Sequence, residues 1–207
     1  MDIFLIRHGE SEAAAGSSEE IDCALTAAGL AQAGAVAAAL APGGVTRILS
    51  SPFRRCLQTA EVLRRVTGAP AELYPALHEH HHAPYPPGDW PLPGKSEIAA
   101  AFPDFAVPRD MPETHWAAVP EDRDRFWKRI SAAAREVLLR FGGRGDARVA
   151  LVTHGAAASV FVQAFCQWPN PLRVGVQVDP GSISILRVEP DGRRVLAKLN
   201  WLPPPLS

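Results

Sequence analysis

The chain alternates short apolar runs with longer segments whose apolar residues recur every three or four positions. The short runs predict strands, several of them buried on both faces, at residues 3–6, 47–49, 72–74, 148–153, 182–188 and 195–201. The longer segments predict helices at residues 26–41, 53–67, 96–102, 121–141 and 155–165. This alternation is typical of an α/β domain, a three-layer α/β/α sandwich with a mostly parallel central sheet.

The stretch from His78 to about residue 120 breaks the pattern. Imidazoles and prolines crowd its first part, which excludes regular structure there. A long loop in a compact domain is usually either functional or disordered, and Tyr85, Trp90 and the imidazoles favour an ordered cap. We therefore expect one domain over residues 1–207, with an irregular cap or pocket insertion at about residues 78–120.

Composition narrows the classes of function. A formal net charge of −1 gives no reason to expect a nucleic-acid or membrane partner. No apolar run approaches the length of a membrane span, and the start lacks the basic region and cleavage site of a signal peptide. Cys23, Cys56 and Cys166 lie too far apart for a disulfide framework or a metal-ligand pair, which predicts a cytoplasmic protein.

Three of the predicted strands lead into residues that bind or attack anions. These residues are Arg7 and His8, then Ser51 followed by Arg54 and Arg55, and finally His154. Parallel strands place their carboxyl ends at one edge of the sheet, so these groups converge if the strands are neighbours. A guanidinium forms bidentate contacts with phosphate, and a helix N-terminus adds oriented N–H groups. The sequence therefore predicts a phosphate site.

A neutral imidazole is a competent nucleophile toward phosphorus, which makes His8 the candidate for covalent catalysis. Cations around the phosphoryl oxygens would neutralise charge in the transition state. The leaving oxygen needs a proton. Glu79, where the chain leaves the sheet, is the candidate acid, and we expect apolar and aromatic residues around it.

Five pieces of the sequence together resemble the histidine phosphatase superfamily, the phosphoglycerate-mutase-like proteins. The pieces are Arg7-His8-Gly9-Glu10-Ser11, Leu25-Thr26 with Gly29, Gln32 and Ala33, Ser51-Pro52-Phe53-Arg54-Arg55 with Gln58-Thr59-Ala60, and Leu77-His78-Glu79 followed later by Val152-Thr153-His154-Gly155. Each alone is a weak signal, but their order along residues 2 to about 160 makes the resemblance specific. Residues 78–120 correspond to a variable region of the family.

The resemblance implies a role for each matching residue. His8 would be phosphorylated, and Glu79 would act as the acid and base. The phosphoryl group would be bound by Arg7, Arg55, His154 and Ser11. The arginine of the second motif aligns with Arg55, although its neighbour Arg54 stays open as the ligand. The family often has an asparagine shortly after the first motif, where this chain has alanines, so the substrate stays open.

We therefore expect a phosphomonoesterase that acts on a small phosphate ester, or on a phosphoprotein, without a cofactor. Two alternatives remain: a phosphomutase of the phosphoglycerate type, and a phospho-ligand binding protein without turnover. A metal is not expected. Neighbouring residues of an extended run point in opposite directions, and no cysteine or aspartate adjoins the histidine cluster. His80, His82 and Trp90 are instead expected at the rim of the substrate pocket, and the oligomeric state is open.

Overall fold

A computed structural model describes residues 1–81, 92–117, 120–143, 145–168 and 175–206. In this part of the chain one seven-stranded sheet has the order β4-β3-β2-β5-β1-β6-β7. Its strands are β1 (Asp2–Arg7), β2 (Arg47–Ser50), β3 (Ala71–Leu73), β4 (Phe105–Ala106), β5 (Arg148–Thr153), β6 (Ile183–Val188) and β7 (Arg194–Trp201). The first five are parallel, whereas β6 and β7 run antiparallel at one edge. The sheet is thus mostly parallel, as predicted.

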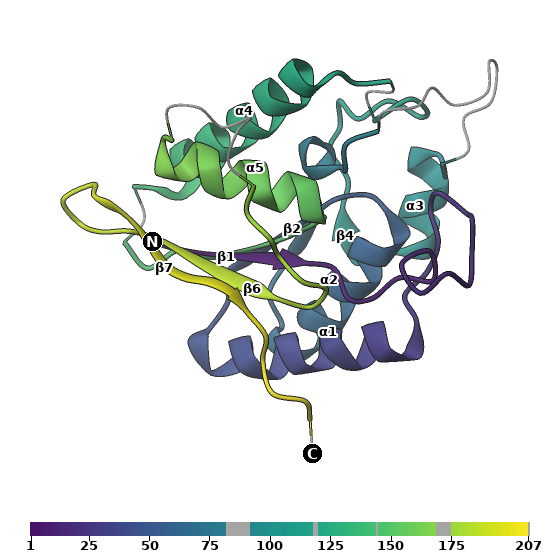
Figure 1. Cartoon of the computed structure of the whole chain (residues 1–207), viewed down its shortest axis with the longest axis horizontal. Coiled ribbons are helices and arrows are strands. Elements are labelled where there is room, and N and C mark those ends of the chain that lie inside the picture. Colours follow the sequence, from purple (N-terminus) through teal and green to yellow (C-terminus); the bar gives the residue numbers. More distant parts are fainter. Residues whose placement is uncertain (82–91, 118–119, 144, 169–174, 207) are drawn as a thin grey trace.

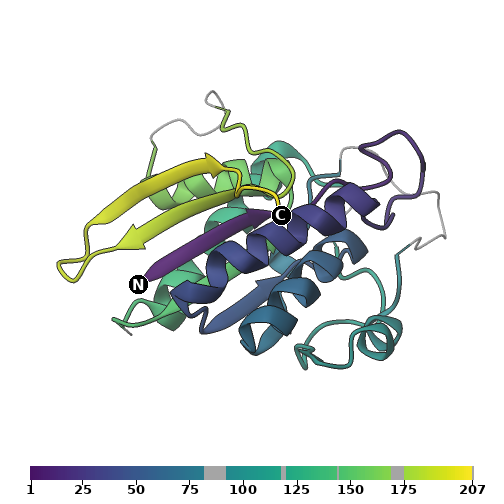
Figure 2. The same ribbon diagram turned by 90° about the horizontal axis from the view of Figure 1, so that it is seen from below.

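Helices cover both faces of this sheet (Figure 1). They are α1 (Ala27–Leu40), α2 (Arg54–Thr67), α3 (Lys95–Ala101), α4 (Arg123–Phe141) and α5 (Gly155–Cys166), with short 3-10 turns η1 (Ala41–Gly43) and η2 (Pro75–Leu77). α1 and α2 lie on one face and α4 and α5 on the other, with α1 running alongside β1 in Figure 2. The three-layer fold is confirmed. No described helix is long and apolar enough to cross a membrane.

β1 shows why a wholly apolar run makes a central strand. Phe4 and Ile6 belong to the core under α1 and α2, whereas Ile3 and Leu5 belong to the core under α4 and α5. Successive side chains of a strand face opposite sides of the sheet, so a strand between two helical layers has no polar face. β5 is buried in the same way, and the two strands pair in parallel.

Two details differ from the sequence prediction. β4 is a two-residue strand inside the stretch predicted to be irregular, and it extends the sheet beyond β3. Two residues are too short to show a period, and Pro103 and Pro108 flank them. Helix α4 begins at Arg123, after the predicted start, because the Asp122 side chain accepts the backbone N–H of Arg125 as an N-cap.

A close backbone contact fixes the turn after β1. An added Cβ at Gly9 would collide with the backbone of Gly29, and one at Gly29 would collide with the backbone of Glu10. Thr26 caps α1 by accepting the Gly29 N–H at 3.0 Å and donates to the Glu10 carboxylate at 2.7 Å. The start of α1 therefore holds the turn that follows β1, and that turn carries residue 8.

We predict that Gly29→Ala lowers the free energy of unfolding by about 1–3 kcal/mol, the usual cost of overpacking. The matched control is Gly34→Ala in the same helix, where the added Cβ meets only the flexible Leu206 side chain. Alanine is the better helix former by about 1 kcal/mol, so the control should be neutral or stabilising. Urea unfolding of both variants measures the difference in their free energies of unfolding. Equal stability of the two variants would contradict the close contact between Gly29 and the backbone of Glu10.

Candidate active site

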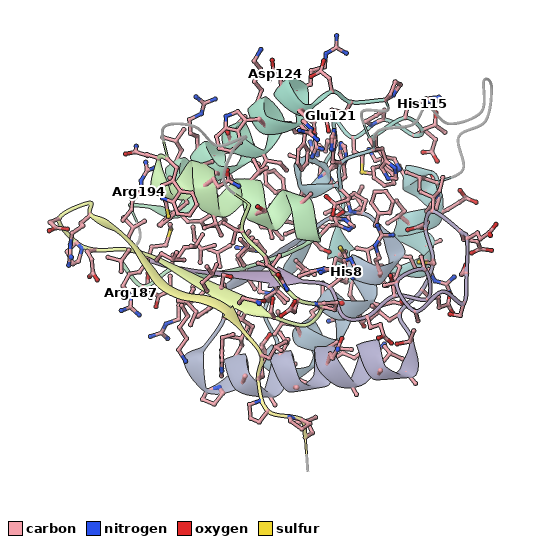
Figure 3. All side chains as sticks on the ribbon, in the orientation of Figure 1. His8, His115, Glu121, Asp124, Arg187 and Arg194 are labelled. Carbon is pink, nitrogen blue, oxygen red and sulfur yellow. The ribbon has the colours of Figure 1, made fainter. Side chains whose placement is uncertain are left out.

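The carboxyl ends of β1, β2 and β5 meet at one edge of the sheet, where they bring together residues distant in sequence. The His8 N–H donates to the Thr153 carbonyl at 2.9 Å, and the Ser51 N–H donates to the Val152 carbonyl at 3.0 Å. The imidazoles of His8 and His154 consequently lie edge to face, with ring centroids 5.2 Å apart. Both rings are buried. Figure 3 shows His8 where β1 ends.

The hydrogen bonds of His8 define its tautomer. Nδ1 lies 2.7 Å from the Gly9 carbonyl, which can only accept, so Nδ1 carries the proton. Nε2 then has a lone pair, and it accepts the Nε–H of Arg55 at 3.3 Å. Burial, followed by the charge of Arg55, lowers the pKa of His8 to about 3. The ring is therefore neutral near pH 7 and can attack through Nε2.

Arg55, and not Arg54, reaches the buried imidazoles. The Arg55 guanidinium donates to the Ile21 carbonyl at 2.9 Å and lies over the Phe53 ring at 4.6 Å. The Arg54 side chain is exposed. The Arg54 backbone N–H donates to the Asp22 carboxylate at 2.7 Å. Adjacent residues of a helix point about 100° apart, so only one of them faces the site.

Thr59 ties this part of α2 to the turn after β1, and the sequence analysis gave it no role. Its hydroxyl donates to the Arg55 carbonyl at 2.9 Å and accepts the Gly9 N–H at 3.2 Å. The side chain is fully buried. It therefore fixes Arg55 and His8 relative to each other.

Arg7 is oriented by a segment that precedes β6. Its Nη1 donates to the Val178 carbonyl at 2.8 Å, whereas its buried Nε has no hydrogen-bond partner among the described residues. The guanidinium also packs on Gly155, where a Cβ would sit 3.5 Å from the guanidinium carbon. Burial lowers the pKa of Arg7 below its ordinary value. The carbonyl that orients Arg7 has no side-chain signature and was missed.

His154 is the N-cap residue of α5 and contacts polar side chains from the end of β2 and from α2. Its Nε2 lies 2.9 Å from the Ser51 hydroxyl and 3.4 Å from the Cys56 sulfur. Burial, followed by the charge of Arg55, holds the pKa of His154 well below 6.5. Burial raises the pKa of Cys56, so this thiol stays protonated. The sequence analysis placed Ser51 at this strand end but did not pair it with His154.

Glu79 follows η2 and reaches across to the first turn of α5. Its carboxylate accepts the N–H groups of Ala156 and Ala157 at 3.2 Å each and that of His80 at 2.9 Å. The first N–H groups of a helix lack partners within it, so the carboxylate caps α5. The charge of Glu79 also acts on Arg7. The carboxylate thus meets polar groups, rather than the apolar surroundings expected from the sequence.

The remaining predicted residues differ in their surroundings. Ser11 is buried, and its hydroxyl accepts the Ala14 N–H at 3.4 Å. The His80 ring stacks on Phe126 of α4 at 4.5 Å, and its Nε2 donates to the Glu121 carbonyl at 2.7 Å. His82 and Trp90 lie outside the described residues.

His81, which the sequence analysis did not select, lies closer to the buried imidazoles. Its ring stacks on Phe53 at 5.8 Å, and Phe53 also contacts the His154 ring at 5.1 Å. Among the described residues, no group of three or more His, Cys, Asp or Glu side chains has the arrangement of a metal site. The prediction that no metal is needed is left to experiment.

These groups lie together at one edge of the sheet. The guanidiniums of Arg7 and Arg55, two neutral imidazoles and the start of α5 are neighbours there. Positive charge and N–H donors of this kind stabilise the oxygens of a phosphoryl group.

This fold and site define the class of phosphoglycerate-mutase-like phosphatases. The structure of a mycobacterial glucosyl-3-phosphoglycerate phosphatase complexed with VO3 superposes with a TM-score of 0.68 and 26% sequence identity, covering 96% of this chain and 98% of the other.

The family model of the histidine phosphatase superfamily (branch 1) matches residues 3–201, and the chain belongs to this superfamily. A glucosyl-3-phosphoglycerate phosphatase of Mycolicibacterium vanbaalenii is 31% identical over 175 residues, or 81% of this chain and 75% of that protein. A probable phosphoglycerate mutase of Photorhabdus laumondii is 37% identical over 83 residues, and the match spans only 39% of each protein.

The lowered pKa of His8 predicts a pH dependence of stability. Below pH 6.5 the unfolded chain binds a proton at residue 8, whereas the folded chain does so only near pH 3. The neutral His8 therefore makes its full contribution to the free energy of unfolding above pH 6.5. This contribution is lost as the pH falls toward 3, and the free energy of unfolding then changes by up to about 1.4 kcal/mol per pH unit. His8→Asn should make the decline shallower in urea unfolding between pH 7 and pH 4. If the free energy of unfolding depends on pH in the same way in the wild type and in His8→Asn, the lowered pKa of His8 is contradicted.

Proposed function

We propose that the protein is a phosphomonoesterase that hydrolyses a small phosphorylated substrate through a phosphohistidine at His8. The observation that carries this proposal is that His8 Nε2 is unprotonated and holds its lone pair toward the Arg55 guanidinium, which donates to it. A neutral imidazole that lies beside two guanidiniums is ready to attack phosphorus and cannot lose its lone pair to a proton near pH 7.

In the first step His8 Nε2 forms a bond to phosphorus while the bond between phosphorus and the ester oxygen breaks. Glu79 in its protonated form gives its proton to that leaving oxygen. In the second step water attacks phosphorus, Glu79 takes a proton from the water, and the bond between phosphorus and Nε2 breaks. Phosphate leaves, and the neutral imidazole is restored.

The phosphoryl oxygens are held by Arg7, Arg55, His154 and, in this proposal, the Ser11 hydroxyl. The buried, unpartnered Nε–H of Arg7 supports its assignment, because such a donor is costly unless a ligand accepts it. Arg55 releases its bond to Nε2 when that atom bonds to phosphorus, and its N–H then turns to a phosphoryl oxygen. Preorganised donors of this kind supply most of the catalysis in phosphoryl transfer.

The substrate in this proposal is a phosphorylated metabolite, as it is for the curated phosphatase relative. His80, His82 and Trp90 remain the proposed rim of the pocket. A phosphoprotein substrate is the alternative within the same reaction. We propose a cytoplasmic setting, because Cys23, Cys56 and Cys166 are all free thiols.

One specific observation favours a second candidate. The partial match to a probable phosphoglycerate mutase is compatible with an enzyme that returns the phosphoryl group to a second substrate rather than to water. The two reactions share the phosphohistidine and differ in its acceptor. Transfer to added phosphoglycerate that outpaces the release of phosphate would identify the mutase.

We predict that His8→Ala abolishes hydrolysis of p-nitrophenyl phosphate in the presence of EDTA, a loss of several orders of magnitude. The exposed His115→Ala is the control for removal of an imidazole and should keep full activity. Mass spectrometry of the wild-type protein, quenched during turnover at alkaline pH, should locate an acid-labile phosphate on residue 8. Phosphate on another residue would contradict the assignment. Phosphate binding without any turnover would identify a binding protein instead.

We predict that Glu79→Gln affects substrates according to their leaving group. Phenyl phosphate needs a proton on its departing oxygen, so its kcat/KM should fall roughly 10²-fold. p-Nitrophenyl phosphate has a leaving group that departs readily as an anion, and its kcat/KM should fall less than about 10-fold. Steady-state kinetics with both esters test this difference. Equal losses on both esters would remove Glu79 from the role of general acid.

A further inference from the structure

A buried ion pair between Arg129 of α4 and Glu121, which precedes that helix, has no part in the proposed chemistry. Arg129 donates from Nε and Nη2 to the two oxygens of Glu121, at 2.9 and 2.6 Å. The side chains are 16% and 2% exposed. Burying a charged pair costs desolvation free energy that its attraction seldom exceeds, so stability alone is a poor reason for it. Figure 3 shows Glu121 near the start of α4.

The same guanidinium also holds the turn that leads to Glu79. Its Nη1 donates to the carbonyl of Ala76 at 2.7 Å and to that of His78 at 3.0 Å. A single planar group thus fixes two carbonyls of the backbone just before Glu79 while its other edge is fixed by Glu121. Only arginine has enough donors in one plane to do this.

The backbone after Glu79 is anchored to the same end of α4. The Glu121 carbonyl accepts from the His80 ring at 2.7 Å, and the Glu121 N–H donates to the His81 carbonyl at 3.1 Å. Phe126 stacks on the His80 ring at 4.5 Å and lies under the Arg129 guanidinium at 5.2 Å. Both sides of Glu79 are therefore tied to α4, while its own carboxylate reaches away to α5.

We infer that Arg129 is a positioning residue for Glu79. With Glu121 it clamps residues 76–81 so that the Glu79 carboxylate stays at the first turn of α5, beside Arg7. The other α4 side chains of the same charge, such as Arg135, are exposed. The inference deepens the proposed function and rests on it only where it concerns proton transfer.

The first test measures the position of Glu79 without turnover. The N–H groups of Ala156 and Ala157 belong to the first turn of α5, and Glu79 is their acceptor. Their protection from hydrogen exchange therefore reports whether the carboxylate is in place. We expect Arg129→Met to speed exchange at both amides at least tenfold, and Glu79→Ala, which removes the acceptor itself, should do the same. Arg135→Met in the same helix is the matched control and should change neither amide.

The second test measures the consequence for catalysis. Arg129→Met should lower kcat/KM for phenyl phosphate at least tenfold and for p-nitrophenyl phosphate less than threefold. In the Glu79→Gln background, Arg129→Met should leave the ratio of kcat/KM for phenyl phosphate to kcat/KM for p-nitrophenyl phosphate unchanged, because Arg129 acts through Glu79. A general loss of stability would instead lower kcat/KM for both esters by the same factor, and this loss would add to that of Glu79→Gln.

Each outcome separates this inference from the proposed function. Unchanged exchange at the two amides, or equal losses on both esters, would overturn the role of Arg129. Faster exchange in a protein whose wild type hydrolyses no ester would support the clamp and refute the phosphatase. If Arg129→Met fails to fold, Arg129→Lys keeps the charge and the alkyl chain. A lysine cannot bind Glu121 and both carbonyls at once. The faster exchange and the selective loss on phenyl phosphate should therefore both occur at reduced size, and their absence counts against the inference.

Discussion

The organisation of this molecule depends on bringing a buried guanidinium, a half-buried guanidinium and two buried imidazoles together at the carboxyl edge of the sheet. Burial and the neighbouring charge of Arg55 lower the pKa of both imidazoles and keep them in the neutral form near pH 7. The arginines keep their charge, because a guanidinium holds its proton far more strongly than an imidazole does. The result is a site whose positive charge is permanent and whose nucleophile is neutral. That division of roles is what transfer of a phosphoryl dianion requires.

The way the arginines are oriented keeps their charge available. Arg7 is held by the carbonyl of Val178 and Arg55 by that of Ile21. None of the ion pairs found among the described residues involves either side chain. A carbonyl dipole directs a guanidinium without neutralising it, whereas a carboxylate would compete with the ligand. Arg129 shows the opposite case, because its charge is matched by Glu121 and its function is structural.

The sequence could predict which residues converge where the side chain itself has the required chemistry and where the end of a parallel strand determines its position. His8, Arg7 and His154 could be predicted for this reason, and the helical position after Ser51-Pro52 favoured Arg55. The groups that orient these residues could not be predicted, since a backbone carbonyl is the same at every residue. Arg129 looked like any polar position between the apolar residues of an amphipathic helix. Its role depends on the path of a distant turn, which no local pattern encodes.

The start of α5 joins the two halves of the proposed reaction. His154 is its N-cap residue, Gly155 packs on the Arg7 guanidinium, and the next two N–H groups hold Glu79. In the proposed reaction, phosphoryl binding and proton transfer thus share one helix start, while Arg129 holds the turn that carries Glu79. A Cβ added at residue 155 would lie 3.5 Å from the Arg7 guanidinium carbon, an ordinary van der Waals contact, so Arg7 lies directly against the helix start that also holds Glu79. In the proposed reaction the cation that binds the phosphoryl group and the carboxylate that moves the proton are therefore oriented by the same helix start.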